Sequence, residues 1–135
     1  MCSLVLQKKE VEDMLIEIDF NSPQAIYIQL RNQIVMGIAQ ERLRDGDSLP
    51  SVRSLANTLG VNMQTVNKAY AMLRSEGYLI LDRRKGAVIQ VEVENKNAEI
   101  EKINHNLRMV VAQAICKGIS REDMHAVIDD MYEHF

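Results

Sequence analysis

The chain has 135 residues, of which 47% are hydrophobic and 26% are charged, and this balance excludes global disorder and fibrous repeats. One ordinary domain, or one compact domain with a small appendage, fits this length. The apolar runs fall well short of the ~20 residues that a membrane span needs, and the N-terminus lacks the pattern of a secretory signal. We therefore expect a globular protein of the cytoplasm, without a membrane segment.

The net charge of −3 is unevenly distributed along the chain. Residues 51–90 hold six Lys and Arg residues against two Asp and Glu residues, a net of +4, which leaves −7 for the remainder. A basic segment inside an acidic chain is typical of a protein that binds a polyanion at one place. The binding surface is therefore expected in the middle of the chain.

The N-terminal part predicts one strand and one helix. Residues 15–20 alternate between apolar and polar side chains, which is the pattern of a short strand with one buried face. From Pro23 to about Arg42 the apolar positions recur at spacings of three and four, which predicts a helix that packs on a core. These core positions are Tyr27, Leu30, Ile34 and Ile38.

Two further helices follow, separated by a short turn. Pro50 is expected in the first turn of a helix that Gly60 ends, and Asn62 is a favoured N-cap for the next helix, which runs to Gly77. The predicted core positions are Val52, Leu55, Ala56 and Leu59 in the first of these helices and Val66, Ala69, Tyr70 and Leu73 in the second. Two helices joined in this way form a helix-turn-helix.

Two short strands, residues 78–81 and 87–91, surround a basic turn over residues 82–86. A hairpin directly after a helix-turn-helix is the layout of a winged helix-turn-helix domain, which we place at residues 15–92. The fold class is therefore expected to be mainly α with a small β-hairpin.

The composition becomes polar around residues 95–98, and two more helices are predicted over residues 97–135. A glycine, Gly118, ends the first, and Ser120 with Asp123 resembles a capping box at the start of the second. Such a helical hairpin cannot bury both of its apolar stripes alone, so we expect it to form a symmetric homodimer. The apolar stripe of the first helix begins at Ile100, and that of the second helix ends at Phe135. The expected dimerisation residues are Ile103, Leu107, Val110, Ala114, Met124, Val127, Ile128 and Met131.

The exposed face of the helix that begins at Asn62 is suited to reading DNA bases. Gln64 and Asn67 can pair with the adenine edge, Lys68 can reach guanine or phosphate, and Ala71 can contact a thymine methyl group. Met63 and Thr65 lie at the helix start, where free N–H groups favour a phosphate. The alternative interpretation is an ordinary solvated helix face, which the neighbouring basic hairpin disfavours.

The cations of the hairpin turn and of the preceding helix can be interpreted either as DNA contacts or as ordinary surface charges. Arg83, Arg84 and Lys85 either form a solvated turn or lie along a DNA groove beside the helix. Arg53 either pairs with Asp45 or Asp47 or contacts the duplex from the start of its helix.

Motifs for catalysis are absent, and no cofactor is expected. The histidines, His105, His125 and His134, have no pair at a spacing of four residues, so a metal-sensing site with Asp129, Asp130 and Glu133 is the less favoured alternative. Cys2 and Cys116 are expected to be reduced thiols, with Cys116 a small buried hydrophobic residue. The chain is thus predicted not to be an enzyme.

Four stretches of this sequence resemble the DNA-binding domain of the GntR family of bacterial transcription regulators. The similarity covers roughly residues 15–90, through residues 25–30, 46–56, 59–70 and 73–78. The two-helix tail, with residues 118–123 between its helices, is similar to that of the YtrA subfamily, whose small C-terminal region serves dimerisation. This resemblance implies a repressor, in many members one that controls a transporter operon.

The resemblance also assigns roles by position. It places the arginine of the second helix at Arg53, the recognition-helix contacts at residues 62–68, and the wing-tip glycine at Gly86. Arg84 departs from the family pattern, which has a second glycine there. The expected DNA-binding residues are Ser51, Arg53, Asn62, Met63, Gln64, Thr65, Asn67, Lys68, Arg83, Arg84, Lys85 and Gly86.

The sequence thus favours a homodimeric, sequence-specific regulator, and more specifically a repressor, that binds an inverted repeat in double-stranded DNA. The alternative is a winged-helix module that binds protein and not DNA. A regulator gated by a small molecule or a metal would add a sensor to the first interpretation, and the sequence names no effector.

Overall fold

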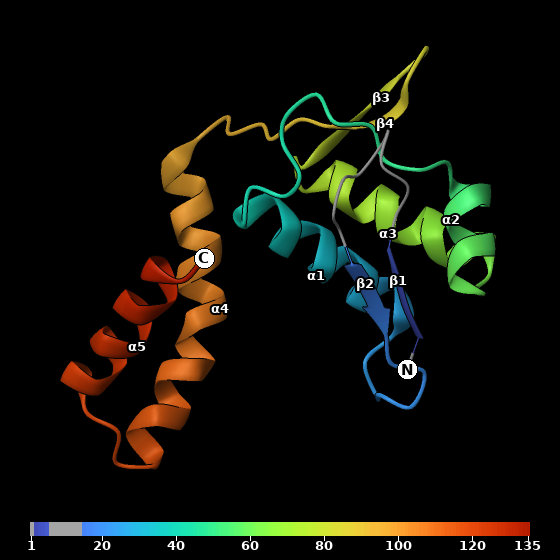
Figure 1. The fold of residues 1–135 in the computed structure, drawn as a ribbon. Coiled ribbons are helices and arrows are strands. Elements are labelled where there is room, and N and C mark those ends of the chain that lie inside the picture. The colour runs from blue at the N-terminus through green and yellow to red at the C-terminus, as the bar shows by residue number, and fades with distance from the viewer. Residues whose placement is uncertain (1, 6–14) are drawn as a thin grey trace. The chain divides into compact units, whose positions relative to one another are not determined.

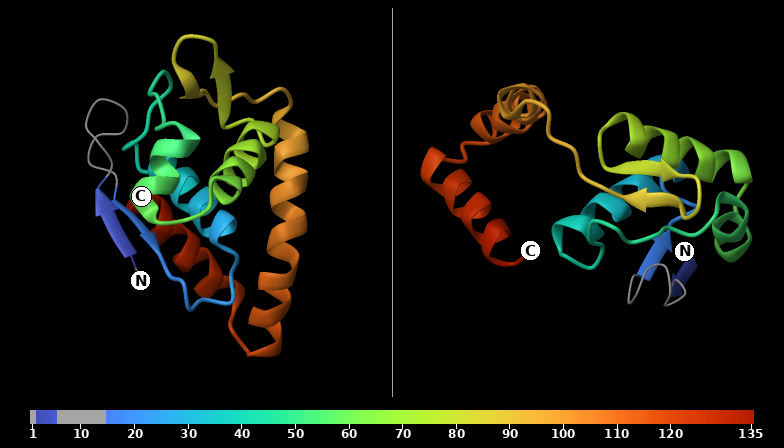
Figure 2. Two further views of the ribbon diagram at one scale, coloured as in Figure 1. Left: turned by 90° about the vertical axis from the view of Figure 1, so that its right-hand side faces the viewer. Right: turned by 90° about the horizontal axis from the view of Figure 1, so that it is seen from above.

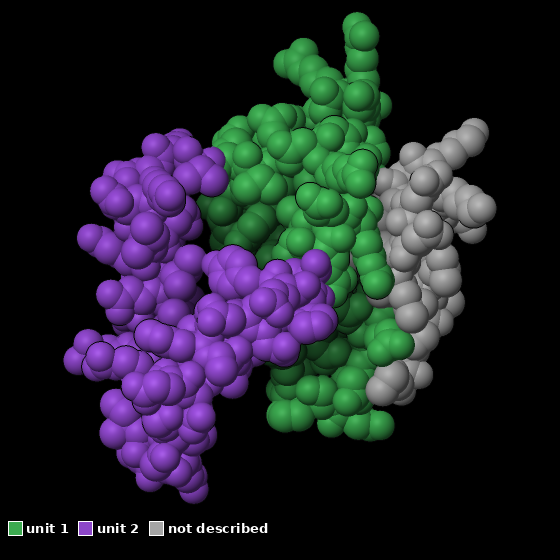
Figure 3. All heavy atoms as spheres, turned by 60° about the vertical axis from the view of Figure 1, so that its left-hand side comes forward, with its two compact units in different colours: residues 1–92 green, residues 93–135 purple. Residues whose placement is uncertain are grey.

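The computed structural model describes residues 2–5 and 15–135 (Figure 1). The elements in chain order are β1 (Cys2–Val5), β2 (Leu15–Ile18), α1 (Ile26–Ala39), α2 (Val52–Leu59), α3 (Met63–Ser75), β3 (Leu79–Asp82), β4 (Gly86–Ile89), α4 (Lys96–Cys116) and α5 (Arg121–Glu133). The fold is mainly α with small antiparallel hairpins, as predicted. The chain divides into two compact units, residues 1–92 and 93–135 (Figure 3).

The first unit begins with a hairpin in which β1 pairs antiparallel with β2, so that Cys2 lies opposite Ile18. Strand β1 was not predicted, because so short a strand is defined by its partner rather than by its own periodicity. Strand β2 ends at Ile18, earlier than predicted, because the Asp19 carboxylate turns the chain by accepting the N–H of Asn21 at 2.9 Å. The side chains of Ile16 and Ile18 are fully buried.

Helix α1 is shorter than predicted at both ends. It begins at Ile26 and not at Pro23, because Ser22 forms a turn by accepting the N–H of Gln24 at 3.1 Å. It ends at Ala39 and not near Arg42, since Glu41 has a left-handed φ of 59° that breaks the helix. Buried Gln29 ties α1 to the end of β2 through hydrogen bonds to both backbone groups of Asp19.

Helices α1, α2 and α3 bury their apolar faces against one another and form the core of the first unit. The predicted stripe of α3 is buried at every position, whereas Tyr27, Ile38 and Val52 are only partly buried at the edge of the core. The buried residues of the three helices include Leu30, Ile34, Leu55, Ala56, Leu59, Val66, Ala69, Tyr70 and Leu73.

An ion pair reinforces the contact between α1 and α3 at the surface. The Arg31 guanidinium donates from Nε and Nη2 to the two carboxylate oxygens of Glu76, at 2.9 and 2.8 Å. This paired hydrogen bond raises the pKa of Arg31 above its ordinary value. The same guanidinium lies 5.7 Å from the ring centre of Tyr78, so this end of α3 is held by several weak contacts.

Helix α2 begins at Val52, later than predicted. Ser51 is the N-cap, and its hydroxyl accepts the N–H of Ser54 at 3.1 Å, so Pro50 lies outside the helix and not in its first turn. The Pro50 carbonyl instead accepts a buried hydrogen bond from the Tyr70 hydroxyl at 2.8 Å. Gly60 ends α2 in the left-handed conformation, as predicted.

The β3–β4 hairpin, here called the wing, projects beyond the helices of its unit (Figures 1 and 2). Strand β3 lies one residue later than predicted, and β4 starts one residue earlier and ends two residues earlier, since Asp82 pairs with Gly86. The loop before α2 lies along β4 as a short third strand: Gly46 donates to the carbonyl of Ile89 and Leu49 to that of Ala87, both at 2.8 Å. The sequence did not predict this pairing, which connects the wing to the start of α2.

Gly77, between α3 and β3, is required by two features of its position. Its φ is +83°, and a Cβ atom there would lie 3.0 Å from the carbonyl oxygen of Glu92. The chain returns to this point after β4, where Glu92 donates to the Gly77 carbonyl at 2.8 Å. Gly77 thus both ends α3 and closes the base of the wing.

In the second unit, side-chain caps start both helices. Asn95 accepts the N–H groups of Asn97 and Ala98 at the start of α4, and Ser120 accepts the N–H of Asp123 at the start of α5. Gly118, with a φ of +71°, turns the chain between the two helices. Among the described residues, no helix combines the length and apolar character that crossing a bilayer requires.

The buried hydroxyl of Tyr70 provides a test of the core. Tyr70→Phe removes the donor to the Pro50 carbonyl, and we expect the free energy of unfolding to fall by about 1–2 kcal/mol. Tyr132→Phe is the matched control, because that side chain is 84% exposed. Urea unfolding followed by circular dichroism at one protein concentration measures both variants, and equal effects would contradict the assignment.

Candidate nucleic-acid interface

The exposed face of α3 is set by the burial of its opposite face. Because Val66, Ala69, Tyr70 and Leu73 are buried, the side chains of Gln64, Asn67, Lys68 and Ala71 lie at the surface of the unit. Asn62 caps the helix by accepting the N–H of Gln64 at 2.7 Å, so its side-chain oxygen is occupied. Thr65, on the flank of this face, is only partly exposed.

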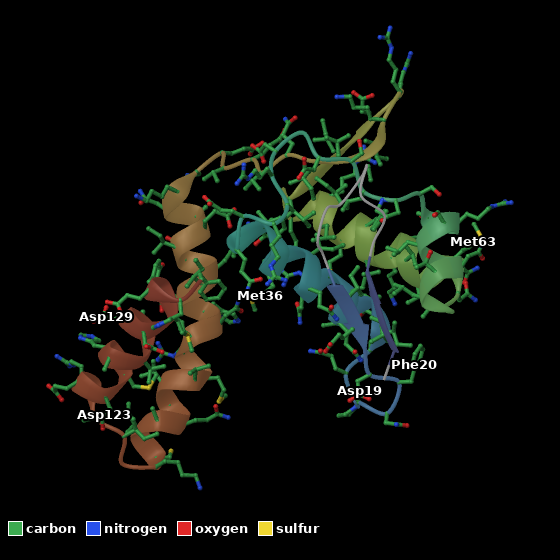
Figure 4. All side chains as sticks on the ribbon, in the orientation of Figure 1. Asp19, Phe20, Met36, Met63, Asp123 and Asp129 are labelled. Atoms are coloured by element: carbon green, nitrogen blue, oxygen red, sulfur yellow. The ribbon has the colours of Figure 1, made fainter. Side chains whose placement is uncertain are left out.

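Met63 extends from the first position of α3 and is 43% exposed (Figure 4). An apolar side chain at the start of an exposed helix face has no core contact to explain it. Its thioether can make apolar contacts with a ligand but donates no hydrogen bond.

Lys68 is held on one side of this face. Its ammonium nitrogen lies 4.3 Å from the centre of the Tyr27 ring, which belongs to α1. A cation above an exposed aromatic ring gains about 0.5–1 kcal/mol, so the contact favours one orientation of the side chain. The charge of Lys68 therefore lies toward α1.

The start of α2 offers a hydroxyl and a guanidinium to the surface. Ser51 accepts the N–H of Ser54, which leaves its own O–H as a donor. Arg53 is exposed and forms no ion pair among the described residues. The carboxylates of the structural alternative have other partners here: Asp45 accepts the N–H of Val91 and Asp47 accepts that of Arg44.

The tip of the wing holds its three cations on a well-defined turn. The Asp82 carboxylate accepts the N–H groups of Arg84 at 2.7 Å and Lys85 at 3.0 Å, and these two hydrogen bonds lower the pKa of Asp82 below its ordinary value. Gly86 supplies the left-handed residue of the turn, with a φ of +76°. Arg84 does not need a positive φ, which explains why the turn accommodates arginine where the family pattern has glycine.

Arg83, Arg84 and Lys85 are exposed, and no ion pair engages them within the part of the chain that the structure describes. With Arg53 they give the unit a set of unneutralised cations on two separate elements. Such cations are suited to phosphate oxygens.

A groove of about 550 Å³ separates α3 from the wing and the start of α2. Its lining includes Asn67, Ala71 and Arg74 of α3, with Leu81 of β3 on the far side. Neither Arg74 nor Leu81 was among the site residues expected from the sequence. Arg74 lies seven residues after Asn67, two turns along the same flank of α3, and that spacing could have identified it.

Apolar side chains cover much of the surface of the second unit. The predicted dimerisation residues Ile103, Leu107, Val110, Val127, Ile128 and Met131 are exposed, and Met124 is partly exposed. Ala114 is the exception, because it is buried and offers no surface. A groove of about 650 Å³ runs along α4 and is lined by Ile100, Ile103, Leu107 and Val111 among others.

The second unit shows no arrangement suited to a metal. His105, His125 and His134 are exposed, and no group of three or more His, Cys, Asp or Glu side chains that could hold an ion occurs among the described residues. Cys116 is exposed and not buried as predicted, because it lies two residues after buried Ala114, ~200° farther round the last turn of α4. The thiol of Cys2 lies outside the described residues.

Comparisons with known proteins agree with this geometry. Residues 24–89 match the model of the family "Bacterial regulatory proteins, gntR family". The chain is 31% identical to the transcriptional repressor YtrA of Bacillus subtilis over 119 residues, which cover 87% of this chain and 92% of that protein. The resemblance to YtrA-type proteins predicted from the sequence is therefore confirmed.

Solved structures extend the likeness to the fold. A transcriptional antiterminator from Listeria monocytogenes EGD-e superimposes with a TM-score of 0.74 at 25% identity, over 85% of this chain and 87% of that one. YtrA from Sulfolobus acidocaldarius, a GntR-family transcription factor, gives a TM-score of 0.62 at 40% identity, over 75% of this chain and 97% of that one. These relatives are regulators and not enzymes, and the chain belongs to the GntR family as a DNA-binding transcription regulator with a winged helix-turn-helix.

Proposed function

We propose that this protein is a homodimeric repressor that binds an inverted-repeat operator in double-stranded DNA. Each subunit places α3 in a major groove and the wing along the neighbouring groove. The observation that carries the proposal is the exposed polar face of α3, together with Arg53 and the wing cations, which form no ion pair within the described part of the chain.

The contacts divide by chemistry into two kinds. Ser51, Arg53, Thr65, Lys68 and the wing cations serve the phosphate backbone and set the register of the protein on the duplex. Met63, Gln64 and Asn67 face base edges and supply sequence preference. The roles of Asn62 and Gly86 are to cap α3 and to shape the wing turn, and their backbone groups approach the DNA.

The second unit supplies the dimer contact. The exposed apolar residues of α4 and α5 form continuous stripes and are not scattered singly over the surface. A second copy of the same helices would cover them. Two-fold symmetry of the protein then requires two-fold symmetry of the operator. The residues proposed for this contact are Ile103, Leu107, Val110, Met124, Val127, Ile128 and Met131.

In this proposal the protein acts in the cytoplasm. By resemblance to its family, the operon that it controls encodes a transporter. A mobility-shift titration against the DNA upstream of its own gene, with an unrelated duplex as competitor, tests the proposal. Tight binding that survives the competitor supports it. Equal affinity for both duplexes at every salt concentration would favour a winged-helix module that binds protein instead.

Arg84 provides a test of the wing. We expect Arg84→Ala to weaken operator binding by about 1 kcal/mol or more and to reduce the slope of log K against log salt concentration by about 1, because one phosphate contact is lost. Arg42→Ala removes the same charge from an exposed position outside the proposed surface and serves as control. A salt series of titrations measures both, and an unchanged slope for Arg84→Ala would remove the wing tip from the interface.

Leu107 provides a test of the dimer. We expect Leu107→Glu to shift the protein to monomer and to weaken operator binding at least tenfold, a loss of about 1.4 kcal/mol or more, because it buries a charge in the contact. Met109→Glu is the matched control, since Met109 is exposed on the opposite side of α4. Analytical ultracentrifugation gives the oligomeric state, and a Leu107→Glu variant that stays dimeric would contradict the assignment.

A further inference from the structure

The face of α3 that the proposed function places against base edges carries no free cation in its first turns. The exposed side chains on it are Met63, Gln64, Asn67 and Ala71. Arg74 lies in the last turn of the helix, beside the groove next to the wing. Lys68 is the remaining cation of α3, so its position decides what this face can read.

Lys68 is directed away from the base-reading face. Its ammonium nitrogen lies 4.3 Å from the centre of the Tyr27 ring on α1, so the charge is placed on the flank of the helix. A cation on the flank of a helix in the major groove faces the phosphate backbone, which borders the groove on both sides. In this orientation the Lys68 ammonium is suited to a phosphate group, and the remaining exposed side chains of the first turns include no guanine donor.

The chemistry of the remaining side chains matches one class of base pair. Guanine presents two acceptors in the major groove, and Arg or Lys is the usual donor pair for them. The amides of Gln64 and Asn67 match the donor and acceptor of adenine, and the apolar groups of Met63 and Ala71 match the thymine methyl group. The exposed side chains in the first turns of this face are therefore all suited to A·T pairs.

The side chains at the tip of the wing are also suited to A·T-rich DNA. Arg83 and Arg84 are exposed at its tip and have no acidic partner among the described residues. Guanidinium groups favour the narrow minor groove of A·T-rich DNA, where the negative potential is enhanced.

We propose that α3 reads A·T pairs, so that each operator half-site is A·T-rich at the positions under this helix. The proposal rests on the proposed function and concerns α3 alone, since Arg53 contacts the duplex from α2. Tyr27 acts in it as a positioning residue, because it holds Lys68 on the flank of the helix.

Selection of bound sequences from a randomised duplex library tests the proposal with the full-length protein. Wild type is compared with Met63→Arg and Asn67→Arg, two exposed substitutions that add a guanine donor, after circular dichroism has shown that each variant is folded. The operator positions whose preferred base changes in a variant are the positions under α3. We expect wild type to select A or T there and the variants to select G.

Competition titrations then give the size of the preference. Replacing an A·T pair by G·C at one of these positions is expected to weaken wild-type binding by about 5- to 100-fold. Lys68→Gln is the matched control, since it removes a cation from the same helix. It should weaken binding to all sequences alike and leave the selected bases unchanged.

Each outcome separates the two proposals. If wild type selects G or C at the positions under α3, or if neither arginine variant changes a preferred base, the A·T assignment is wrong and the proposed function stands. A change of preferred base in Lys68→Gln would also overturn the assignment, because Lys68 would then read a base. If folded wild type enriches no sequence, the proposed function fails and the inference fails with it.

Discussion

The burial of one face of α3 against α1 and α2 is the constraint on which the rest of this structure depends. Val66, Ala69 and Leu73 are fully or almost fully excluded from solvent, so the rotation of the helix about its axis has one solution. That rotation exposes Gln64 and Asn67 at the surface. A hydrophobic requirement thus decides which polar groups can meet DNA, although none of the core residues would touch it.

A second constraint couples the wing to the helix-turn-helix. The loop that leads into α2 pairs with β4 through Gly46 and Leu49, two to five residues before the cap at Ser51. The Asp45 carboxylate fastens the end of the wing by accepting the N–H of Val91 at 3.1 Å. The cations of the wing and of α2 therefore belong to one hydrogen-bonded framework, and their spacing is preorganised before any duplex arrives. Preorganisation of this kind reduces the ordering that binding would otherwise require.

The two units differ in how far they bury their own apolar side chains. The first unit buries its apolar stripes internally, whereas α4 and α5 leave theirs exposed. Periodicity in the sequence could predict that these stripes exist but not whether one chain can cover them, because that depends on how much surface two helices present to each other. Ala114 and Cys116 illustrate the difficulty. They are two positions apart in one helix, and only the folded chain shows that the alanine is buried and the cysteine exposed.

The sequence by itself determined the order and type of the main elements, the caps at Asn62 and Ser120, the glycines that end helices and the polar face of α3, because these depend on local periodicity and backbone preference. It could not determine strand β1 or the pairing of the loop before α2 with β4, because each requires a partner distant along the chain. The position of Lys68 is the clearest case. Its charge is evident from the sequence, but only the tertiary structure places the Tyr27 ring beneath it, because that contact joins two residues 41 positions apart along the chain.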